Sequence, residues 1–323
     1  MSRLTIAVIG GGRNCEHDVS LASAAAVAAS LDATRYRIVH LTIGRDGRWR
    51  DATDTVVGFG SVVESLRGCD VVFPMVHGRC GEDGTLAALC ELVDVPYVGS
   101  PVAAGAIGMN KHVTKIVAES VGIRTATAVL LNRLSARQYV FDGPVIVKPN
   151  SAGSSIGVSL VTDPALLAPA IAQALEFDGD ALVEELIDGR EIDIAVMRRP
   201  DGSVMVSPAL EIEGDGLFDH NTKYGGAAIF SVPAMLDADA RTSLESAAVR
   251  MYDALGCAGV ARIDFFLTSV GLVLNEVNTT FTAQSQVPRM FEAAGMPYER
   301  LLDTLVADAI ASRGRFVAAK TGQ

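Results

Sequence analysis

A predicted hairpin over residues 260–278 constrains the fold of this 323-residue chain more than any other segment. Two β-like runs flank residues 269–271 (Ser-Val-Gly), which fit a three-residue hairpin loop with glycine in its left-handed position. If residues 269–271 form this loop, the two strands pair so that Asp264 lies directly opposite Glu276. Two carboxylates held face to face repel each other unless a cation lies between them. The hairpin therefore predicts either a cation site or a polar face that meets only water.

The same register, in which Thr268 pairs with Leu272, places Arg262 opposite Asn278. Period-2 alternation puts both side chains on the face that carries the carboxylates. Asp, Glu and Asn oxygens are hard ligands that suit Mg²⁺, which usually binds through one or two carboxylates together with oxygens of a phosphate substrate. We therefore expect this face to bind Mg²⁺ that bridges phosphates.

Charge and composition exclude several classes of protein. The chain has 27 Lys and Arg against 38 Asp and Glu, a net charge of −11, and surplus basic residues are what nucleic-acid backbones require. Apolar residues make up 49% of the chain, which favours buried cores. The longest apolar run, residues 21–31, is far shorter than the ~20 residues of a membrane span, and the five cysteines form no CxxC pair. We expect a cytoplasmic protein with no nucleic-acid or membrane partner and no secretion signal.

The first third of the chain alternates strand-like and helix-like stretches. Residues 4–9 are typical of a buried strand and residues 19–31 of an Ala-rich helix. Further strand-like runs follow at residues 36–43 and 71–76. This alternation predicts a doubly wound parallel sheet over residues 1–103. A Rossmann dinucleotide fingerprint is excluded because Cys15 stands at the position of its third glycine.

The rest of the chain predicts α+β regions. Residues 104–186 combine a helix around residues 109–120 with two strands and a small-residue loop. From residue 187 onward, strand-like runs precede a helix in which Leu244, Ala247, Ala248 and Met251 form one apolar face. We therefore expect an α/β domain followed by two α+β domains, at residues 1–103, 104–186 and 187–323.

Lys148 and the loop that follows it are a candidate phosphate site. A lysine at the end of a buried strand, followed by small residues at 149–157, supplies one positive charge and several backbone N–H groups. An ordinary strand-to-loop turn has the same composition, so both interpretations stay open. A Walker loop is excluded because the spacing GxxxxGK[ST] is absent. Lys111 is either a second phosphate contact or a solvated helix lysine.

Two polar segments follow predicted strands of the N-terminal sheet. His77 begins the run His-Gly-Arg-Cys-Gly-Glu-Asp-Gly directly after one strand, and Glu16 lies in the turn after the first strand. Polar groups at the carboxyl ends of strands in an open sheet lie where ligands usually bind. His77 is therefore either a ligand-binding or a structural residue, and Glu16 by itself fits a helix N-terminal acid.

Taken together, these segments resemble the D-alanine:D-alanine ligases of the ATP-grasp superfamily over nearly the whole chain. The matching segments are residues 11–20, 77–84, 96–100, 109–111, 147–157, 184–191, 223–224, 262–264 and 276–279. The resemblance implies a three-domain ATP-grasp fold that holds ATP between its last two domains. It also implies an ADP-forming ligase that joins two D-alanines through an acyl phosphate for peptidoglycan synthesis, and it suggests a homodimer.

The resemblance assigns roles to individual residues. The ATP-binding residues would be Lys111, Lys148, Ser155, Glu184, Glu185, Leu186, Ile187 and Glu191. The ligands of two Mg²⁺ ions, or of Mn²⁺, would be Asp264, Glu276 and Asn278. The catalytic residues would be Glu16, Ser154, Tyr224 and Arg262, and the substrate-binding residues His77, Lys223, Ser285 and Gln286. Among them, Arg262 would stabilise the oxyanion and Glu16 would bind the ammonium group of the first amino acid.

One segment departs from the family pattern. After Asn278 the family reads N-T-small-P-G-apolar-T and its glycine N–H completes the oxyanion hole, whereas residues 278–288 here are two residues shorter and lack Pro-Gly. Gln286 also stands where an apolar residue is usual. The acceptor is therefore open: D-alanine, or a different amine in a related amino-acid ligase of a specialised pathway. A non-catalytic nucleotide-binding module is the third alternative.

Overall fold

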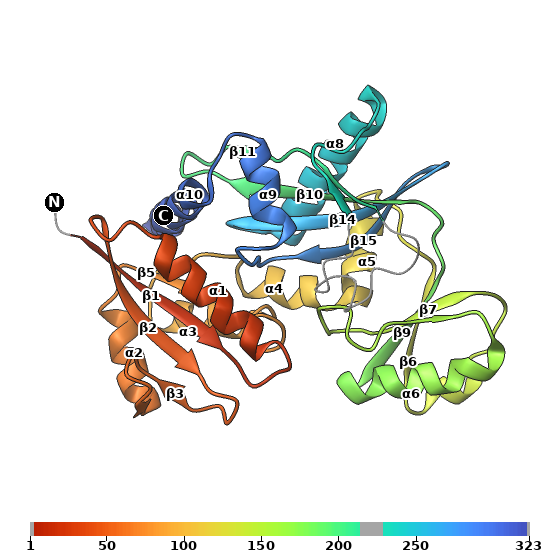
Figure 1. The fold of residues 1–323 in the computed structure, drawn as a ribbon, viewed down its shortest axis with the longest axis horizontal. Coiled ribbons are helices and arrows are strands. Elements are labelled where there is room, and N and C mark those ends of the chain that lie inside the picture. The colour runs from red at the N-terminus through yellow and green to blue at the C-terminus, as the bar shows by residue number, and fades with distance from the viewer. Residues whose placement is uncertain (1–2, 214–228, 322–323) are drawn as a thin grey trace.

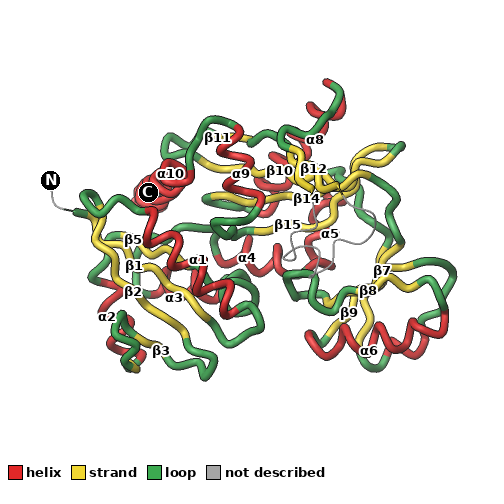
Figure 2. The backbone as a smooth tube through the Cα atoms, in the orientation of Figure 1, coloured by secondary structure: helices red, strands yellow, loops and turns green. Residues whose placement is uncertain are grey.

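The computed structural model describes residues 3–213 and 229–321, which form three β-sheets with helices packed against them (Figures 1 and 2). Lys223 and Tyr224, two of the predicted site residues, lie outside the described residues. Within the described part of the chain, no helix has both the length and the apolar character needed to cross a membrane.

The first sheet has the strand order β4-β3-β2-β1-β5. Its strands are β1 (Leu4–Gly11), β2 (Tyr36–Ile43), β3 (Trp49–Arg50), β4 (Val56–Val57) and β5 (Val71–Pro74). Its helices are α1 (His17–Ser30), α2 (Phe59–Arg67) and α3 (Thr85–Leu92). Strand β1 pairs in parallel with both β2 and β5, whereas the two-residue strands β3 and β4 pair antiparallel at one edge.

Both faces of β1 are buried, as a doubly wound sheet requires. Ile6 and Val8 belong to a core cluster with residues of α1, and Ala7 and Ile9 belong to another with residues of α2 and α3. Side chains therefore alternate between two helical layers. The predicted parallel arrangement with helices on both faces is confirmed for β1, β2 and β5, whereas the antiparallel strands β3 and β4 make the sheet a mixed one.

The second sheet has the order β6-β9-β7-β8 and is antiparallel throughout. Its strands are β6 (Ala128–Asn132), β7 (Val145–Pro149), β8 (Ser159–Val161) and β9 (Asp180–Glu185). Helix α6 (Leu167–Phe177) packs on it, and short 3₁₀ helices cover Ser135–Gln138 and Pro164–Leu166. Because β7 and β9 are neighbours, Lys148 near the end of β7 lies beside the strand that carries Glu184.

The third sheet has the order β13-β12-β10-β14-β15, with β11 paired to β10. Its strands are β10 (Arg190–Arg198), β11 (Val204–Val206), β12 (Leu210–Glu213), β13 (Ile229–Ser231), β14 (Val260–Thr268) and β15 (Gly271–Asn278). The helices around it are α4 (Val102–Met109), α5 (Lys111–Ser120), α8 (Ala238–Leu255) and α9 (Gln286–Ala293). The predicted apolar face of α8 is buried, and Gly256 ends that helix in a left-handed conformation.

The turn between β14 and β15 differs from the prediction. Thr268 pairs with Gly271 across a two-residue turn, so the expected three-residue loop and the pair of Thr268 with Leu272 are wrong. A β-bulge follows, in which Asn275 is the extra residue. This extra residue cancels the shift made by the shorter turn.

Beyond the bulge the predicted register is confirmed. Asp264 pairs with Glu276, and Arg262 pairs with Asn278. The polar face of the hairpin therefore carries the four side chains that the sequence placed there.

The C-terminal helix α10 (Tyr298–Thr321) returns to the first sheet, as Figure 1 shows where the blue C-terminal helix lies beside the red N-terminal strands. Leu301 and Leu305 share one core cluster with Val8 of β1 and Met197 of β10. The first and third sheets are thus joined through a common core, while the borders expected at residues 103 and 186 stay predictions.

Candidate active site

A cleft of about 980 Å³ lies between the second and third sheets. That volume is within the usual range for small-molecule sites. The predicted site residues that line it are Lys111, Lys148, Ser155, Glu184, Glu185, Leu186, Ile187, Glu191, Arg262, Asp264, Glu276 and Gln286. Residues predicted from separate motifs are therefore brought into one cleft.

A buried group of three charges stands beside this cleft. Glu184 lies between two lysines, with its Oε2 2.9 Å from Nζ of Lys148 and its Oε1 3.1 Å from Nζ of Lys115. Burial acts to raise the pKa of Glu184, but the two lysines outweigh it and hold that pKa below its usual value. Burial lowers the pKa of Lys115. Glu184 is the counter-ion of both lysines, and its contact with ATP stays a prediction.

Residues 185–187 follow β9 along the cleft wall. The Glu185 carboxylate accepts a hydrogen bond of 2.8 Å from the backbone N–H of Thr127, which holds the end of the strand. Leu186 is exposed and Ile187 is half-buried, and both line the cleft. Apolar side chains beside backbone polar groups suit a flat base such as adenine.

Lys111 is the first residue of α5, where it faces the acidic hairpin. The helix begins there because the Asn110 side chain accepts a hydrogen bond of 3.0 Å from the N–H of Val113. Nζ of Lys111 donates to the carbonyl oxygen of Ala152 at 2.6 Å and lies 3.8 Å from Oε2 of Glu276. One cation therefore reaches both the loop after β7 and the carboxylate pair.

Arg262 and Asp264 form a bidentate ion pair on β14. Nε and Nη2 of Arg262 each donate to an Asp264 oxygen at 2.7 Å. On the neighbouring strand β10, Asp193 pairs with Asp264 in register and is completely buried, with Oδ2 3.4 Å from Nε of Arg262. Burial acts to lower the pKa of Arg262, but Asp264 and Asp193 outweigh it and raise that pKa. Arg262 stays charged.

Asn278 contacts both carboxylates of the hairpin. Its Nδ2 donates to Oδ2 of Asp264 at 3.0 Å and to Oε1 of Glu276 at 3.4 Å. Carboxylate oxygens of Asp264 and Glu276 thus both face the Asn278 amide. When this amide is rotated by about 180°, its oxygen faces the same place in place of its NH₂ group. Across residues 3–213 and 229–321, no cluster of three or more His, Cys, Asp or Glu side chains is suited to a metal ion. A cation here depends on two carboxylates and the Asn278 amide.

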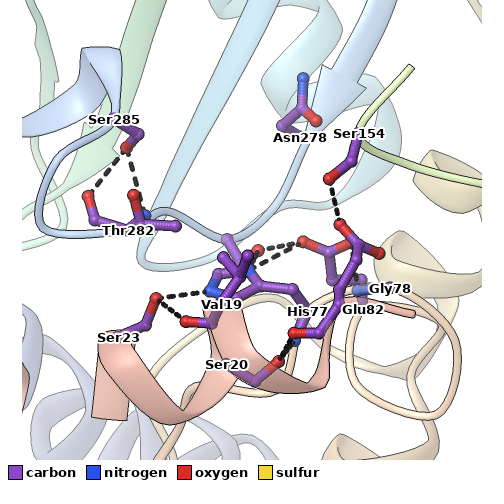
Figure 3. Close-up of polar contacts among 12 residues, drawn as sticks. Val19, Ser20, Ser23, His77, Gly78, Glu82, Ser154, Asn278, Thr282 and Ser285 are labelled. Atoms are coloured by element: carbon purple, nitrogen blue, oxygen red, sulfur yellow. Dashed lines mark hydrogen bonds and ion pairs between the residues drawn. The ribbon is translucent and has the colours of Figure 1, made fainter. Parts of the chain in front are cut away.

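Glu16, which directly precedes helix α1, contacts Ser154 of the loop after β7. Figure 3 shows the Ser154 hydroxyl pointing toward that helix. The Ser154 hydroxyl donates to Oε1 of Glu16, which is only 8% exposed. Ser154 and Ser155 both have φ of 54°, a left-handed conformation that non-glycine residues rarely adopt. Gly78 approaches Glu16 so closely that a Cβ on it would overlap the carboxylate. Two residues that the resemblance assigned to the catalytic set, Glu16 and Ser154, are therefore in contact.

His77 is held from both sides by hydroxyl groups (Figure 3). Its Nε2 lies 3.0 Å from Oγ of Ser23 on α1, and its Nδ1 lies 3.1 Å from Oγ1 of Thr280, just after β15. Glu82, whose Oε1 lies 3.6 Å from Nδ1 of His77, accepts hydrogen bonds from Thr280 and from the N–H of Gly78. The shortened segment after Asn278 is thereby joined to the first sheet.

Burial acts to raise the pKa of Glu82, but its hydrogen bonds and His77 outweigh burial and hold the pKa below its usual value. His77 is 5% exposed. A structural role explains these contacts, and a contact with substrate stays a prediction.

Ser285 directly precedes α9, and Gln286 is the first residue of that helix. The Ser285 hydroxyl donates to the carbonyl oxygen of Thr282 at 2.8 Å and accepts from its N–H at 3.1 Å, which closes the preceding turn. Gln286 is 4% exposed, and its Oε1 accepts a hydrogen bond of 3.0 Å from Nη1 of Arg262. The polar partner that a buried amide requires is therefore Arg262.

Sequence reasoning missed several residues of these networks. They are Ser23, Glu82, Lys115, Asp193, Asn275 and Thr280. Helical spacing offered a signal for Lys115, which lies four residues after Lys111, and strand alternation offered one for Asp193, two residues after Glu191. Thr280 gave no local signal because its partners are about 200 residues away.

The sequence matches two parts of one known family. Residues 117–307 match the family described as D-ala D-ala ligase C-terminus, and residues 5–61 and 57–100 match D-ala D-ala ligase N-terminus. The chain is 41% identical to a D-alanine–D-alanine ligase of Nocardia farcinica, over 96% of this chain and 98% of that protein. A D-alanine–D-alanine ligase of Rhodococcus erythropolis is 38% identical, with 96% and 98% covered.

This chain belongs to the D-alanine–D-alanine ligase family.

Solved structures of the same ligase family share the fold. VanG D-Ala:D-Ser ligase from Enterococcus faecalis is 32% identical with a TM-score of 0.81, over 95% of this chain and 100% of that one. A D-alanine–D-alanine ligase from Bacillus anthracis complexed with ATP is 26% identical with a TM-score of 0.80, over 97% and 99%. The ATP-grasp fold predicted from the sequence is confirmed.

Proposed function

We propose that the protein is an ATP-dependent ligase that joins two D-alanines and forms ADP and phosphate. The observation that carries this proposal is the single cleft in which Lys111 and Lys148 lie with Asp264 and Glu276. The lysines attract a triphosphate, and the carboxylates suit a divalent cation that bridges its phosphates. Membership of the family supports the same reaction.

In the proposed first step, the carboxylate of one D-alanine attacks the γ-phosphorus of ATP, which gives an acyl phosphate and ADP. Lys111 and Lys148 would bind the phosphate oxygens and stabilise the charge spread over them. Glu16, buried beside Ser154, would bind the ammonium group, which leaves the carboxylate directed toward the phosphate.

In the proposed second step, the neutral amine of the second amino acid attacks the acyl carbonyl. The tetrahedral intermediate carries a negative oxygen. Its nitrogen loses a proton to solvent, the carbonyl re-forms and inorganic phosphate is expelled. Arg262 keeps its charge beside Asp264 and Asp193 and would stabilise that oxygen as a fixed donor.

Asp264, Glu276 and Asn278 fit Mg²⁺ because oxygens of both carboxylates face the Asn278 amide, and that amide can supply a third hard oxygen when it is rotated. We propose that they hold two Mg²⁺ ions, for which Mn²⁺ can substitute. The metal would neutralise phosphate charge during phosphoryl transfer.

A different acceptor amine is the second candidate, because a polar side chain, Gln286, lines the cleft beside Arg262. We also propose a homodimer, which sedimentation would test. A cytoplasmic location is supported by the need for ATP and by the five cysteines, which are all free thiols.

Phosphate release from ATP and Mg²⁺, measured over a panel of amino acids with mass spectrometry of the products, tests these proposals. D-alanyl-D-alanine formed from D-alanine alone supports the first candidate. A mixed dipeptide without D-alanyl-D-alanine supports the second. Absence of phosphate release with every amino acid would contradict both and leave a nucleotide-binding module.

A further inference from the structure

Gln286 binds the one guanidinium nitrogen of Arg262, Nη1, that does not donate to Asp264. Asp264 accepts from Nε and Nη2 of Arg262, and Oε1 of Gln286 accepts from Nη1 at 3.0 Å. Each of the three guanidinium nitrogens therefore has an acceptor. Gln286 lies at the first position of α9, so its backbone is fixed by that helix.

The chemistry of the two groups fixes the orientation of the Gln286 amide. Arginine has five N–H donors and no acceptor, so the amide oxygen must face Arg262 and the amide NH₂ must point away from it. The hydrogen bonds to Asp264 and Gln286 occupy three of the five N–H groups. Within the described residues, the other two N–H groups make no further hydrogen bond, and they are available to a ligand in the cleft that both residues line.

The neutrality of the amide matters in this environment. Arg262 already lies beside two buried carboxylates, Asp264 and Asp193. A carboxylate at position 286 would add a further negative charge beside Arg262 and repel an anionic ligand, whereas the apolar side chain that is usual at this position in the family would offer Nη1 no acceptor. An amide accepts the hydrogen bond and leaves the positive charge of Arg262 available.

We propose that Gln286 is a positioning residue that acts through Arg262. Its amide oxygen holds the guanidinium in one orientation, so that the two remaining N–H groups stabilise the anionic intermediate of the ligase reaction. This inference rests on the proposed function for its kinetic consequence, but the orientation of Arg262 is independent of it.

The experiment compares Gln286→Leu with Gln284→Leu, a matched control in which an exposed glutamine two residues earlier is replaced. Loss of a residue that orients a metal ligand typically costs 10- to 100-fold in activity, and by analogy we expect kcat of Gln286→Leu to fall by about that factor. We expect KM for ATP to stay near the wild-type value and the variant to remain folded at the assay temperature, with a modest fall in thermal midpoint because a buried N–H of Arg262 loses its acceptor. Gln284→Leu should match the wild type in all three.

A structural role alone would lower the thermal midpoint and leave kcat per folded molecule unchanged, and that result would overturn the proposal. Gln286→Glu provides a second variant, since it keeps an oxygen acceptor but adds charge. We expect it to fold and to have reduced kcat, and wild-type kcat in this variant would contradict the argument from neutrality.

Crystal structures of the wild type and of Gln286→Leu give a readout that does not depend on activity. We expect one guanidinium orientation for Arg262 in the wild type and a changed or divided orientation in the variant. An unchanged orientation would overturn the proposal even if the protein proved to catalyse another reaction. Lack of turnover in the wild type, by contrast, would contradict the proposed function. The role of Gln286 would then be decided by the orientation of Arg262 in the two crystal structures.

Discussion

Asp264 lies directly opposite Glu276 even though the turn that joins their strands is one residue shorter than the sequence predicts. The bulge at Asn275 restores the register between the turn and the acidic pair. It also turns Asn275 toward the second sheet, where Nζ of Lys148 donates to its Oδ1 at 3.4 Å. One irregularity thus aligns the carboxylates and contacts the lysine on the opposite wall of the cleft.

Glu276→Gln tests the proposed metal site. The amide is nearly isosteric with the carboxylate, so we expect the fold to persist. The amide is also a much weaker Mg²⁺ ligand, and the metal stabilises transition-state charge by several kcal/mol. We therefore expect kcat to fall roughly 100-fold or more. Phosphate release and circular dichroism provide the measurements. Glu292→Gln, an exposed change on α9, is the control, and full activity of Glu276→Gln would contradict the ligand assignment.

Gly78→Ala tests the position of Glu16. A Cβ at Gly78 would overlap the Glu16 carboxylate, whereas a Cβ at Gly122 would meet nothing within 4 Å. Both glycines have positive φ, of 70° and 74°, so each change costs about 1–2 kcal/mol of backbone strain. We expect KM for the first amino acid to rise in Gly78→Ala only, with KM for ATP unchanged in both. Equal kinetics in the two variants would show that Glu16 does not bind this substrate.

Lys148→Met and Lys115→Met separate two lysines that share Glu184. Lys148 lines the cleft and would contact phosphate, so we expect its loss to raise KM for ATP about tenfold, equivalent to roughly 1.4 kcal/mol. Lys115→Met leaves the pair of Lys148 and Glu184 and is expected to change KM for ATP by less than about threefold, under 0.7 kcal/mol. Steady-state kinetics at varied ATP check both values, and the reverse ranking would contradict the assignment of Lys148.

We expect the Glu82→Gln substitution to change how the free energy of unfolding depends on pH. The pKa of Glu82 is lower in the folded protein than its ordinary value of 4.5, so its carboxylate stabilises the fold above about pH 4.5. That stabilisation is lost as the pH falls below 4.5 through the folded-state pKa. We expect the variant to be about 1–2 kcal/mol less stable at pH 7, with the difference shrinking below pH 4.5.

Urea denaturation of the Glu82→Gln variant and of the wild type at pH 7, 5 and 4 measures this difference. A constant difference over the whole range would show that the carboxylate charge does not contribute to stability.

Local pattern was enough to predict the elements that present the functional side chains. The alternation of β14 and β15 placed Arg262, Asp264, Glu276 and Asn278 on one face because side chains in a strand alternate with a period of two. The buried face of α8 followed from helical spacing in the same way. The exact turn was not predicted, since a bulge elsewhere in the hairpin changed the number of residues that the turn needed.

Tertiary structure alone decided which distant groups meet. His77 contacts Thr280 across 203 positions, Lys148 contacts Asn275 across 127, and Arg262 contacts Gln286 across 24. None of these pairs lies within one helix or one hairpin, so no periodicity relates them. Their contacts arise because buried polar groups must find partners once three sheets and α10 pack together. The sequence by itself determined the strands, the helices and the chemical groups that they carry, whereas packing decided that Gln286 and Asp264 hold the same arginine.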